Sequence, residues 1–345
     1  MAKLIFIDSF DHYSASQMAR KWSTLGTSTI VAGRTGNGMR GGALEFPSKT
    51  FNAEYTTMTM GLAYNTSSRA NAPIRFLNAT NSVEVSLSHV GDGRLQFLFG
   101  IGSGTTNVPS PPSTFVLHAN EWYYLEMQAA IVSGGPPAHL IASARVNEAE
   151  ILTWDYTASF GAAGASFNRI NMQGPGAGLT AIIDDLYVTD TEFLGDVRIG
   201  VLYPNAVGDS SQWVPNAAGA NWQQVEEHPA DDDTTYVSTP TVGQKDLYNL
   251  DDIDPAFVGT IKGVQALWCV KKSDEGSGAV KGIWKSGSTE IVQSDGHNYI
   301  APNGFFPSAA NYLYDIETER KSLFTAADWT KTELNGLQLG ITRTV

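Results

Sequence analysis

The sequence predicts an almost all-β protein made of two sandwich domains, the first over residues 1–195 and the second over residues 196–345. Three observations support this fold class. The chain of 345 residues is longer than one hydrophobic core usually supports, so two domains are expected. Apolar and polar residues alternate with a period of two along many short segments, which Gly, Asn, Pro and Ser separate. Segments with a helical pattern are scarce.

Strands of the first domain are predicted wherever this alternation is clear. Short strands at such spacing indicate a sandwich or jelly roll rather than alternating strand–helix units. Ser16–Leu25 is expected to form a helical turn or two, because a serine precedes it and Gly26 follows it. The predicted strands are Lys3–Phe10, Gly42–Phe46, Thr56–Tyr64, Ile74–Leu77, Ser82–His89, Arg94–Ile101, Trp122–Ala129, His139–Val146, Ile151–Trp154, Arg169–Met172 and Ala181–Thr189.

The second domain is predicted to begin with a strand at Val197–Leu202. A long Asn- and Gly-rich loop, Pro204–Pro229, follows it, and we expect Trp213 and Trp222 to anchor this loop to the body of the domain. The remaining predicted strands are Val264–Lys271, Val280–Ser286, Ser288–Gln293, His297–Phe305, Ala310–Ile316 and a closing strand that reaches Ile341.

The charge of the chain argues against nucleic-acid binding. The formal net charge is −13, and no Lys/Arg cluster of the kind that neutralises phosphates is present. The second domain is the more acidic one, with a net charge of −9 from Asp196 onward against −4 up to Gly195. This excess favours solubility without identifying a partner.

Cysteine content and the start of the chain limit the compartment and the kinds of site. Cys269 is the only cysteine, so an intrachain disulfide and a Cys-based zinc site are excluded. The apolar run after Met1 is too short for a signal peptide, and no segment approaches the roughly 18 apolar residues that cross a bilayer. We therefore expect a protein made in a cytoplasm, without a cleaved signal and without membrane insertion.

The pattern of residues supports neither nucleophilic catalysis nor metal binding. No Gly-x-Ser-x-Gly turn is present, and no pair of histidines has the spacing of metal ligands. The glycine-rich stretch Gly33–Gly42 is read as turns between strands, because a dinucleotide site would need alternating helices. We predict no enzyme activity, no catalytic residue, no metal and no cofactor, and a structural place for each histidine: His12, His89, His118, His139, His228 and His297.

Paired carboxylates are the more serious case, because jelly rolls host glycosidases that need two carboxyls on one face of a cleft. Asp315, Glu317 and Glu319 would share a face if they lay on a strand. We interpret them as a solvated strand end or a turn, because Arg320 and Lys321 follow directly. A depolymerase acting through Glu317 stays open as an alternative.

Other acidic and aromatic groups are given ordinary structural interpretations. Asp184 and Asp185 are neighbours and cannot share a face of a strand, so one is expected to cap a loop or point to solvent and the other to hold a turn or a cation. The acidic stretches 231–233 and 251–254 offer oxygen ligands for calcium, yet neither has the EF-hand pattern. A sugar-stacking platform on Trp154 or Tyr156 remains a minor alternative.

The first domain resembles the concanavalin A-like, or laminin-G-like, jelly roll. The resemblance rests on three segments in order, which together span most of residues 1–193. They are Gly33–Gly38 leading to Gly41–Phe46, the strand segment Leu117–Glu126, and the run from a short hairpin at Arg145–Asn147 to the closing Ile183–Val188.

The whole chain resembles bacteriophage virion proteins that pair this jelly roll with a second β-domain. The carrying segments are Asp196–Asn205, Trp213–Pro215, Thr234–Val237 and the ending from Trp329 to Gly340. The resemblance implies a structural or adhesive protein of a tail or capsid surface, located in the virion, and it brings no catalytic residue to this chain. Its expected partners are other virion proteins, further copies of itself in a homo-oligomer, and a host surface glycan. A glycan-binding adhesin module is the alternative function.

Overall fold

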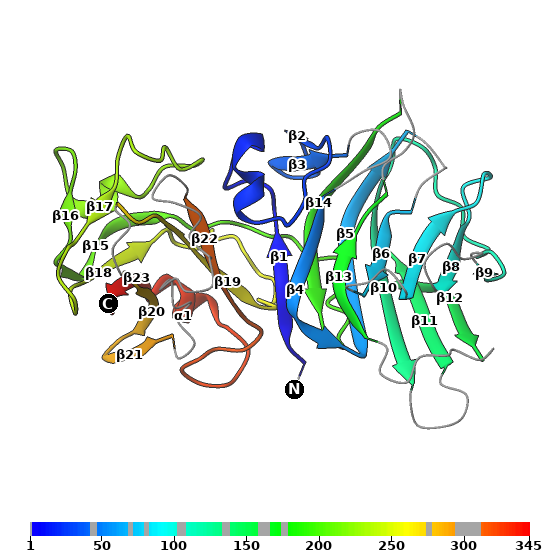
Figure 1. The fold of residues 1–345 in the computed structure, drawn as a ribbon. Helices are drawn as coiled ribbons and strands as arrows, with labels where there is room; N and C mark the ends of the chain where they lie inside the picture. The colour runs from blue at the N-terminus through cyan, green and yellow to red at the C-terminus, as the bar shows by residue number, and fades with distance from the viewer. Residues whose placement is uncertain are drawn as a thin grey trace. The chain divides into compact units, whose positions relative to one another are not determined.

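A computed structural model of the chain describes residues 2–41, 47–67, 72–78, 83–101, 108–132, 139–157, 166–173, 179–273, 278–293 and 312–345 (Figure 1). The chain divides into two compact units, Met1–Ile199 (unit 1) and Gly200–Val345 (unit 2). Strands dominate both units, so the predicted all-β fold class is confirmed. In the part of the chain that the structure describes, no helix is long and apolar enough to span a membrane.

Unit 1 is a sandwich of two antiparallel sheets (Figure 1). The eight-stranded sheet has the order β12 (Ala149–Tyr156), β11 (His139–Val146), β10 (Trp122–Val132), β5 (Thr57–Thr66), β14 (Ala181–Thr189), β3 (Asn37–Arg40) and β2 (Thr29–Ala32), and β1 (Leu4–Asp8) pairs with β14. The six-stranded sheet has the order β4 (Ser48–Tyr55), β13 (Phe167–Asn171), β6 (Ile74–Leu77), β7 (Val83–His89), β8 (Leu95–Ile101) and β9 (Val108–Pro109). A short 3₁₀ helix, η1 (Ala15–Arg20), follows β1.

The core of unit 1 lies between these sheets. Alternate side chains of β5 and β10 point inward, and the register places Leu125 opposite Leu62. Contacts cross the core from one sheet to the other: the Tyr64 hydroxyl lies 3.3 Å from His89 Nε2, and Phe99 stacks on Trp154 with ring centroids 4.4 Å apart. The period-two pattern of the sequence therefore produces a filled apolar layer between the sheets.

Unit 2 contains a five-stranded antiparallel sheet and two two-stranded ribbons. The sheet has the order β15 (Pro204–Ser211), β18 (Lys245–Leu250), β23 (Leu337–Arg343), β20 (Val280–Ser286) and β21 (Thr289–Val292). The ribbons pair β16 (Val214–Pro215) with β17 (Val237–Ser238), and β19 (Val264–Val270) with β22 (Leu313–Glu319). Two short helices, η2 (Asn221–Gln224) and α1 (Lys331–Asn335), complete the described part of the unit.

Two predictions in the second domain are wrong. Val197–Leu202 is not a strand, because side chains of unit 1 rather than a neighbouring strand bind its main chain. Pro204–Pro229 is not one loop, because it contains β15, β16 and η2. Most strands of the first domain lie within a few residues of their predicted bounds, while β2, β3 and β4 had not been predicted. The predicted strands Gly42–Phe46 and His297–Phe305 lie outside the described residues.

Candidate functional site

The outer face of the eight-stranded sheet, turned away from the core, carries a buried aromatic cluster. Tyr124 of β10 and Tyr187 of β14 stack over β5 with ring centroids 6.4 Å apart. A Cβ atom on Gly61 would lie 2.2 Å from the Tyr187 ring, so glycine is needed for this close approach. The small residues Gly61 and Ala63 thus let two tyrosines pack on a face that alternation alone would leave to solvent.

Residues 191–199, which we call the strap, cover this aromatic cluster without forming a strand. Leu194 is 8 % exposed and packs with Tyr124 and Tyr187, while Val197 packs against the same cluster. Phe193 lies over the guanidinium of Arg145, 4.0 Å from the ring centroid. The outer face is therefore closed by the last residues of unit 1 itself.

Side chains of unit 1 bind the main chain of the strap at successive positions. In each case a backbone N–H or C=O of the strap meets a polar side chain of the sheet or of a neighbouring turn. The donors and acceptors are Gln128 Nε2 to Thr191 O (2.7 Å), Thr189 Oγ1 to Glu192 O (2.5 Å), Leu194 N to Tyr187 Oη (2.9 Å), Gly195 N to Glu126 Oε1 (2.9 Å), Asp196 N to Glu148 Oε1 (3.3 Å), Arg34 Nη2 to Val197 O (2.6 Å) and Ile199 N to Asp185 Oδ1 (2.8 Å).

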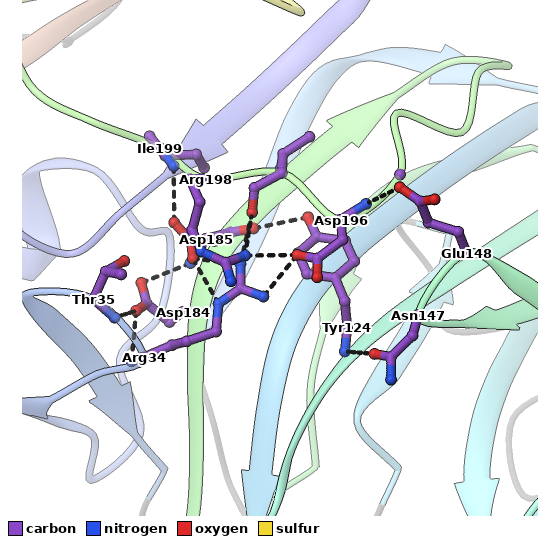
Figure 2. A network of polar contacts seen from close by, with 12 residues as sticks. Arg34, Thr35, Tyr124, Asn147, Glu148, Asp184, Asp185, Asp196, Arg198 and Ile199 are labelled. Carbon is purple, nitrogen blue, oxygen red and sulfur yellow. Dashed lines mark hydrogen bonds and ion pairs between the residues drawn. The ribbon is translucent and has the colours of Figure 1, made fainter. Parts of the chain in front are cut away.

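Arg34, from the loop between β2 and β3, joins the strap to the sheet (Figure 2). Its Nε and Nη2 atoms donate to Asp185 Oδ2 at 3.0 and 2.6 Å, and Nη1 donates to Asp196 Oδ1 at 2.7 Å. The guanidinium also lies over the Tyr124 ring, 5.2 Å from its centroid. Because Asp185 is fully buried and Arg34 nearly so, removal of one partner would leave the other charge buried without it, which is destabilising. We call Arg34, Asp185 and Asp196 the clasp.

Asp184 and Asp185 sit at an irregularity of β14, where the register with β5 shifts and Asp185 has φ = 48°. Both side chains are buried, so neither points to solvent. Asp184 Oδ2 accepts hydrogen bonds from the backbone of Arg34 (2.8 Å) and Thr35 (3.1 Å), which holds the loop after β2. Burial, together with the charge of Asp185, raises the pKa of Asp184 to about 7. One aspartate therefore caps a loop, and the other binds Arg34 and the turn at Ile199.

Glu126 of β10 is a second buried carboxylate beneath the strap. Its Oε1 accepts hydrogen bonds from the Tyr187 hydroxyl and from Gly195 N, while Oε2 has no hydrogen-bond partner among the described residues. Burial raises the pKa of Tyr187 well above its usual value, and the neighbouring Glu126 charge adds to this shift. Tyr187 is thus held protonated as a donor to Glu126 and, through its oxygen, an acceptor for Leu194 N.

A third buried group links β1 to η1. Lys21 Nζ lies 3.2 Å from Asp8 Oδ1, and both side chains are almost completely buried. Asp8 Oδ2 also accepts hydrogen bonds from Tyr13 Oη (2.6 Å) and Trp22 Nε1 (2.8 Å). Burial alone would raise the pKa of Asp8, and the charge of Lys21 and these hydrogen bonds outweigh it, so the pKa lies below its usual value. Burial lowers the pKa of the neighbouring His12 to about 3. This arrangement anchors η1 to the sheet.

Unit 2 has its own buried carboxylate, Asp246 of β18, which is 0 % exposed. Asp246 Oδ1 accepts hydrogen bonds from Gln212 N (2.5 Å) and Trp213 N (2.8 Å). Its Oδ2 accepts from Asn221 Nδ2 (2.5 Å) and Tyr248 Oη (3.0 Å). The segment predicted as a loop is therefore held to the sheet through Asp246. Trp213 adds a hydrogen bond from Nε1 to Gln244 O (3.2 Å), as the anchoring interpretation requires.

The acidic trio of the sequence lies on strand β22, which ends at Glu319, so of the two predicted alternatives the strand end is observed and the turn is not, although Asp315 is buried rather than solvated. Asp315, Glu317 and Glu319 follow each other at every second position and share a face of the strand. Glu317 accepts a hydrogen bond from Trp284 Nε1, and the Glu319 carbonyl accepts one from Trp329 Nε1 (3.3 Å). The Glu317 side chain and the Glu319 main chain thus each bind a tryptophan of the unit 2 core.

Aspartates of the two acidic loops accept hydrogen bonds from backbone amides and from a lysine. Asp233 accepts from Lys271 Nζ at 2.8 Å, and Asp231 Oδ1 accepts from Thr235 N at 3.1 Å. Asp254 Oδ1 accepts from Ala256 N at 2.8 Å. Among the described residues, no three His, Cys, Asp or Glu side chains gather where a metal ion could be held. His297 lies outside the described residues.

Trp154 and Tyr156 lie on the inner side of edge strand β12. Trp154 stacks on the buried Phe99 of the other sheet, with an interplanar angle of 8°. Tyr156 contacts the same ring, with centroids 5.2 Å apart. A flat ring face of Trp154 is therefore occupied by the protein, which does not favour a sugar platform at this position.

The sequence analysis missed the strap, the clasp and the role of Asp246. The sequence does contain one signal of a covered outer face: the small residues Gly61 and Ala63, at alternate positions of β5, leave space there. The partners of Arg34, at Asp185 and Asp196, lie 151 and 162 residues away, so no local pattern connects them.

Comparisons with known proteins find structural similarity only. No protein-family model and no curated protein matches the sequence. Among solved structures, alginate lyase Aly36B is 11% identical, with 58% of this chain and 98% of that chain covered and a TM-score of 0.36. The carbohydrate-binding module CBM66 from Bacillus subtilis is 10% identical, with coverage of 48% and 96% and a TM-score of 0.32. Galectin LEC-6 from Caenorhabditis elegans is 15% identical, with coverage of 41% and 88% and a TM-score of 0.28.

These similarities are too weak to carry an argument about what this chain binds or catalyses. They do not test the bacteriophage resemblance. The assignment of unit 1 to a concanavalin A-like sandwich rests on its two sheets and on the order of the strands within them.

Proposed function

We propose that this chain is a non-catalytic contact protein of a bacteriophage virion, on the tail or the capsid surface. One observation supports the non-catalytic part: buried or partly buried carboxylates in both units hold main chain or structural side chains. Asp185 binds Arg34 and Ile199, Asp246 binds the segment after β15, and Glu317 binds Trp284. A general acid or base must instead reach a substrate proton. The virion location rests on the sequence resemblance alone.

Contact through unit 2 is favoured by its exposed apolar side chains. Ten large apolar side chains are exposed among the described residues, and eight of them belong to unit 2. Such side chains are usual one by one, but their concentration in one unit favours an interface. The eight are Val207, Val214, Tyr236, Val242, Phe257, Val258, Val292 and Val345.

A homo-oligomer formed through unit 2 follows from this proposal, since repeated virion positions favour closed symmetric assemblies. Light scattering coupled to gel filtration tests it. We expect a mass above 37.1 kDa for the wild-type chain and a shift toward the monomer for the double variant Val214→Asp/Val258→Asp. Leu179→Asp, which charges an exposed apolar position of unit 1, is the matched control and should not change the mass. A monomer at all concentrations would contradict self-assembly.

Glycan binding by unit 1 is a second candidate, favoured by one feature of the outer face. Uncharged polar side chains form a row in register across five strands, from β14 to β12. The strap covers one end of the row, and the other end is open to solvent at Thr153. Neutral hydroxyls and amides suit the hydrogen-bonding groups of a sugar chain. The row is Thr189, Thr59, Gln128, Ser143 and Thr153.

Incubation with bacterial envelopes and capsular polysaccharide distinguishes these functions. An adhesin should be retained, and Ser143→Ala/Thr153→Ala should lower retention at least tenfold, whereas Thr114→Ala on another exposed segment should not. No retention leaves the assembly function. Release of reducing sugar that stops in Glu317→Gln would contradict the non-catalytic proposal and favour a depolymerase.

A further inference from the structure

Lys21 and Asp8 form a contact that bulk solvent does not reach. Asp8 ends β1 and Lys21 follows η1, and their side chains are 0 % and 1 % exposed. Aromatic rings lie around the pair, with Lys21 Nζ 5.2 Å from the centroid of the Phe6 ring and 6.0 Å from that of Tyr13. An amine and a carboxyl group are therefore held together in an apolar, desolvated place.

His12 offers this amine a proton acceptor. Its Nε2 atom lies 3.3 Å from Lys21 Nζ, and because an ammonium group has donors only, Nε2 accepts in this contact. Burial, together with the charge of Lys21, lowers the pKa of His12 to about 3, so the imidazole is neutral near pH 7. A neutral base therefore lies within hydrogen-bond distance of the lysine nitrogen.

Three donors polarise the carboxyl group of Asp8. Tyr13 Oη and Trp22 Nε1 both donate to Oδ2, at 2.6 and 2.8 Å, and Phe10 N donates to Oδ1 at 3.0 Å. Two fixed donors on one oxygen stabilise the negative charge that develops there when a nucleophile adds to the attached carbon. Oδ2 is placed to hold this charge, and Oδ1, which faces Lys21, is the oxygen placed to leave.

We propose that Lys21 and Asp8 react with each other and form an amide bond, a covalent crosslink between two side chains of unit 1. A proton first passes from Lys21 Nζ to Asp8 Oδ1, 3.2 Å away, which leaves an amine and a carboxylic acid. The amine lone pair then attacks Cγ, the C–N bond forms, and His12 takes a proton from the nitrogen. His12 returns this proton to the Oδ1 hydroxyl, so that the C–O bond breaks and one molecule of water leaves.

Proximity and burial favour this reaction without a cofactor. Both groups belong to one chain and stay in contact, which takes the place of a high concentration of reactants. Burial lowers the pKa of Lys21 and so favours its neutral form, whereas the lowered pKa of Asp8 makes the neutral pair the minor one. The amide also removes two charges that are costly to keep out of water. The crosslink does not depend on the virion function or the self-assembly proposed above.

Mass spectrometry of the wild-type chain, digested with trypsin after denaturation, tests the crosslink. We expect a branched peptide in which residues 4–20 are joined to residues 21–34, lighter by one water than the two linear peptides together. Fragmentation should place the link at Asp8 and Lys21, which distinguishes it from a succinimide of the same mass. If the folded protein, after prolonged incubation, yields residues 4–20 only as a linear peptide, the proposal is overturned.

Two lysine variants serve as controls. Lys21→Arg should abolish the branched peptide, because a guanidinium stays protonated and cannot attack. Lys49→Arg is the matched variant and should keep the branched peptide. Lys49 Nζ also lies over the Phe6 ring, 5.3 Å from its centroid, but it donates to the Lys21 carbonyl at 2.6 Å rather than to a carboxylate. Because the decisive measurement is made on the wild-type chain, it does not depend on the folding of either variant.

The rate of crosslinking tests the part assigned to His12. Chains labelled in a short pulse of synthesis are denatured at successive times, and the linked fraction is measured at each time. We expect His12→Phe to form the link about 100-fold more slowly, as the loss of a general base requires. His118→Phe, at an exposed position, is the control and should keep the wild-type rate. Equal rates in the wild type and His12→Phe would overturn the role of His12 as the proton acceptor.

Discussion

Each unit ties an irregular segment to its sheet with one buried aspartate, but the two aspartates differ in their partners. In unit 1, Asp185 faces a cation, Arg34, which also reaches Asp196 of the strap. In unit 2, the four groups that donate to Asp246 are uncharged: two backbone amides, an amide side chain and a hydroxyl. Unit 2 therefore depends on a single carboxylate, whereas the clasp of unit 1 shares its charge among several groups.

The hydrophobic cores of the two units differ as well, and the core of unit 1 is the more extensive. In unit 1, buried apolar side chains fill the space between two sheets and also the outer face beneath the strap. In unit 2, the described core is a smaller cluster around Trp284 and Trp329, and every described residue of β19 except Ala266 remains partly exposed. A thin core gains less from burial, so specific hydrogen bonds carry a larger share of its stability.

Removal of the Asp246 carboxylate should have the largest effect. Asp246→Ala removes an acceptor from four donors, two of them buried and two partly buried, and we expect unit 2 to lose about 4 kcal/mol of its free energy of unfolding. Chemical denaturation followed by hydrogen exchange of each unit measures this loss. The exposed Asp252→Ala is the control. An unchanged unit 2 transition would show that the segment after β15 is held by other contacts.

The corresponding change in unit 1 should cost less. Asp185→Ala leaves Arg34 with Asp196 and the Val197 carbonyl, so we expect a loss of about 2 to 3 kcal/mol in the free energy of unfolding. Amide exchange of Ile199 and its neighbours in the strap should accelerate before the sheet opens. The control is Asp196→Ala at the partly exposed end of the clasp, which should cost about 0.5 kcal/mol. Equal effects of the two variants would contradict a central position for Asp185.

The difference between the units also explains how far the sequence could be interpreted. Alternation predicts strands such as β6, β11 and β14 with their observed bounds, because one face of each lies in a deep core. It fails at β18, where Asp246, the second residue of the strand, is a buried polar residue. It also fails at Val197–Leu202, whose apolar residues alternate as in a strand, although Val197 packs against the aromatic cluster on the outer face of the eight-stranded sheet.

The candidate site was less predictable than the fold. For Asp184 and Asp185 the sequence predicted one residue that caps a loop or points to solvent and one that holds a turn or a cation, because neighbours on a strand point in opposite directions. Their partners come from a loop about 150 residues earlier, and such pairing depends on the closed sandwich. Glu317 was predicted to lie at a solvated strand end or in a turn, because basic residues follow it. It lies on β22, and the tryptophan that binds it comes from another strand.

The third prediction concerns the pH dependence of stability. It sharpens the contrast between the two units, because the buried Asp184 of unit 1 titrates near neutrality. Its pKa is raised to about 7 in the folded chain, so the stability it contributes is fully present below about pH 4 and is lost as pH rises toward 7. His12 acts in the opposite direction, because its lowered pKa removes stability as pH falls below about 6.5. The two slopes partly cancel in the wild-type chain.

Comparison with Asp184→Asn isolates the carboxylate. The variant cannot titrate at this position, so its stability relative to wild type should improve by about 2 kcal/mol between pH 4.5 and pH 8, an estimate that allows for solvent screening. Denaturation curves at several pH values measure it. Asp252→Asn serves as the exposed control and should follow the wild-type profile. A difference that does not change with pH would mean that Asp184 is ionised throughout.

The smallest effect is expected for the Tyr187 hydroxyl, which joins the strap to Glu126. Tyr187→Phe keeps the ring on Gly61 and removes the donor to Glu126 and the acceptor for Leu194 N, so it should cost about 1 kcal/mol. Because Leu194 still fills the apolar cluster, strap amides should exchange only severalfold faster. Tyr123→Phe, which removes a partly exposed hydroxyl from the neighbouring strand position, is the control. If the strap amides exchange as fast as in Asp185→Ala, the strap is held by its hydrogen bonds alone. The apolar packing that distinguishes unit 1 from unit 2 would then not extend to the outer face of the eight-stranded sheet.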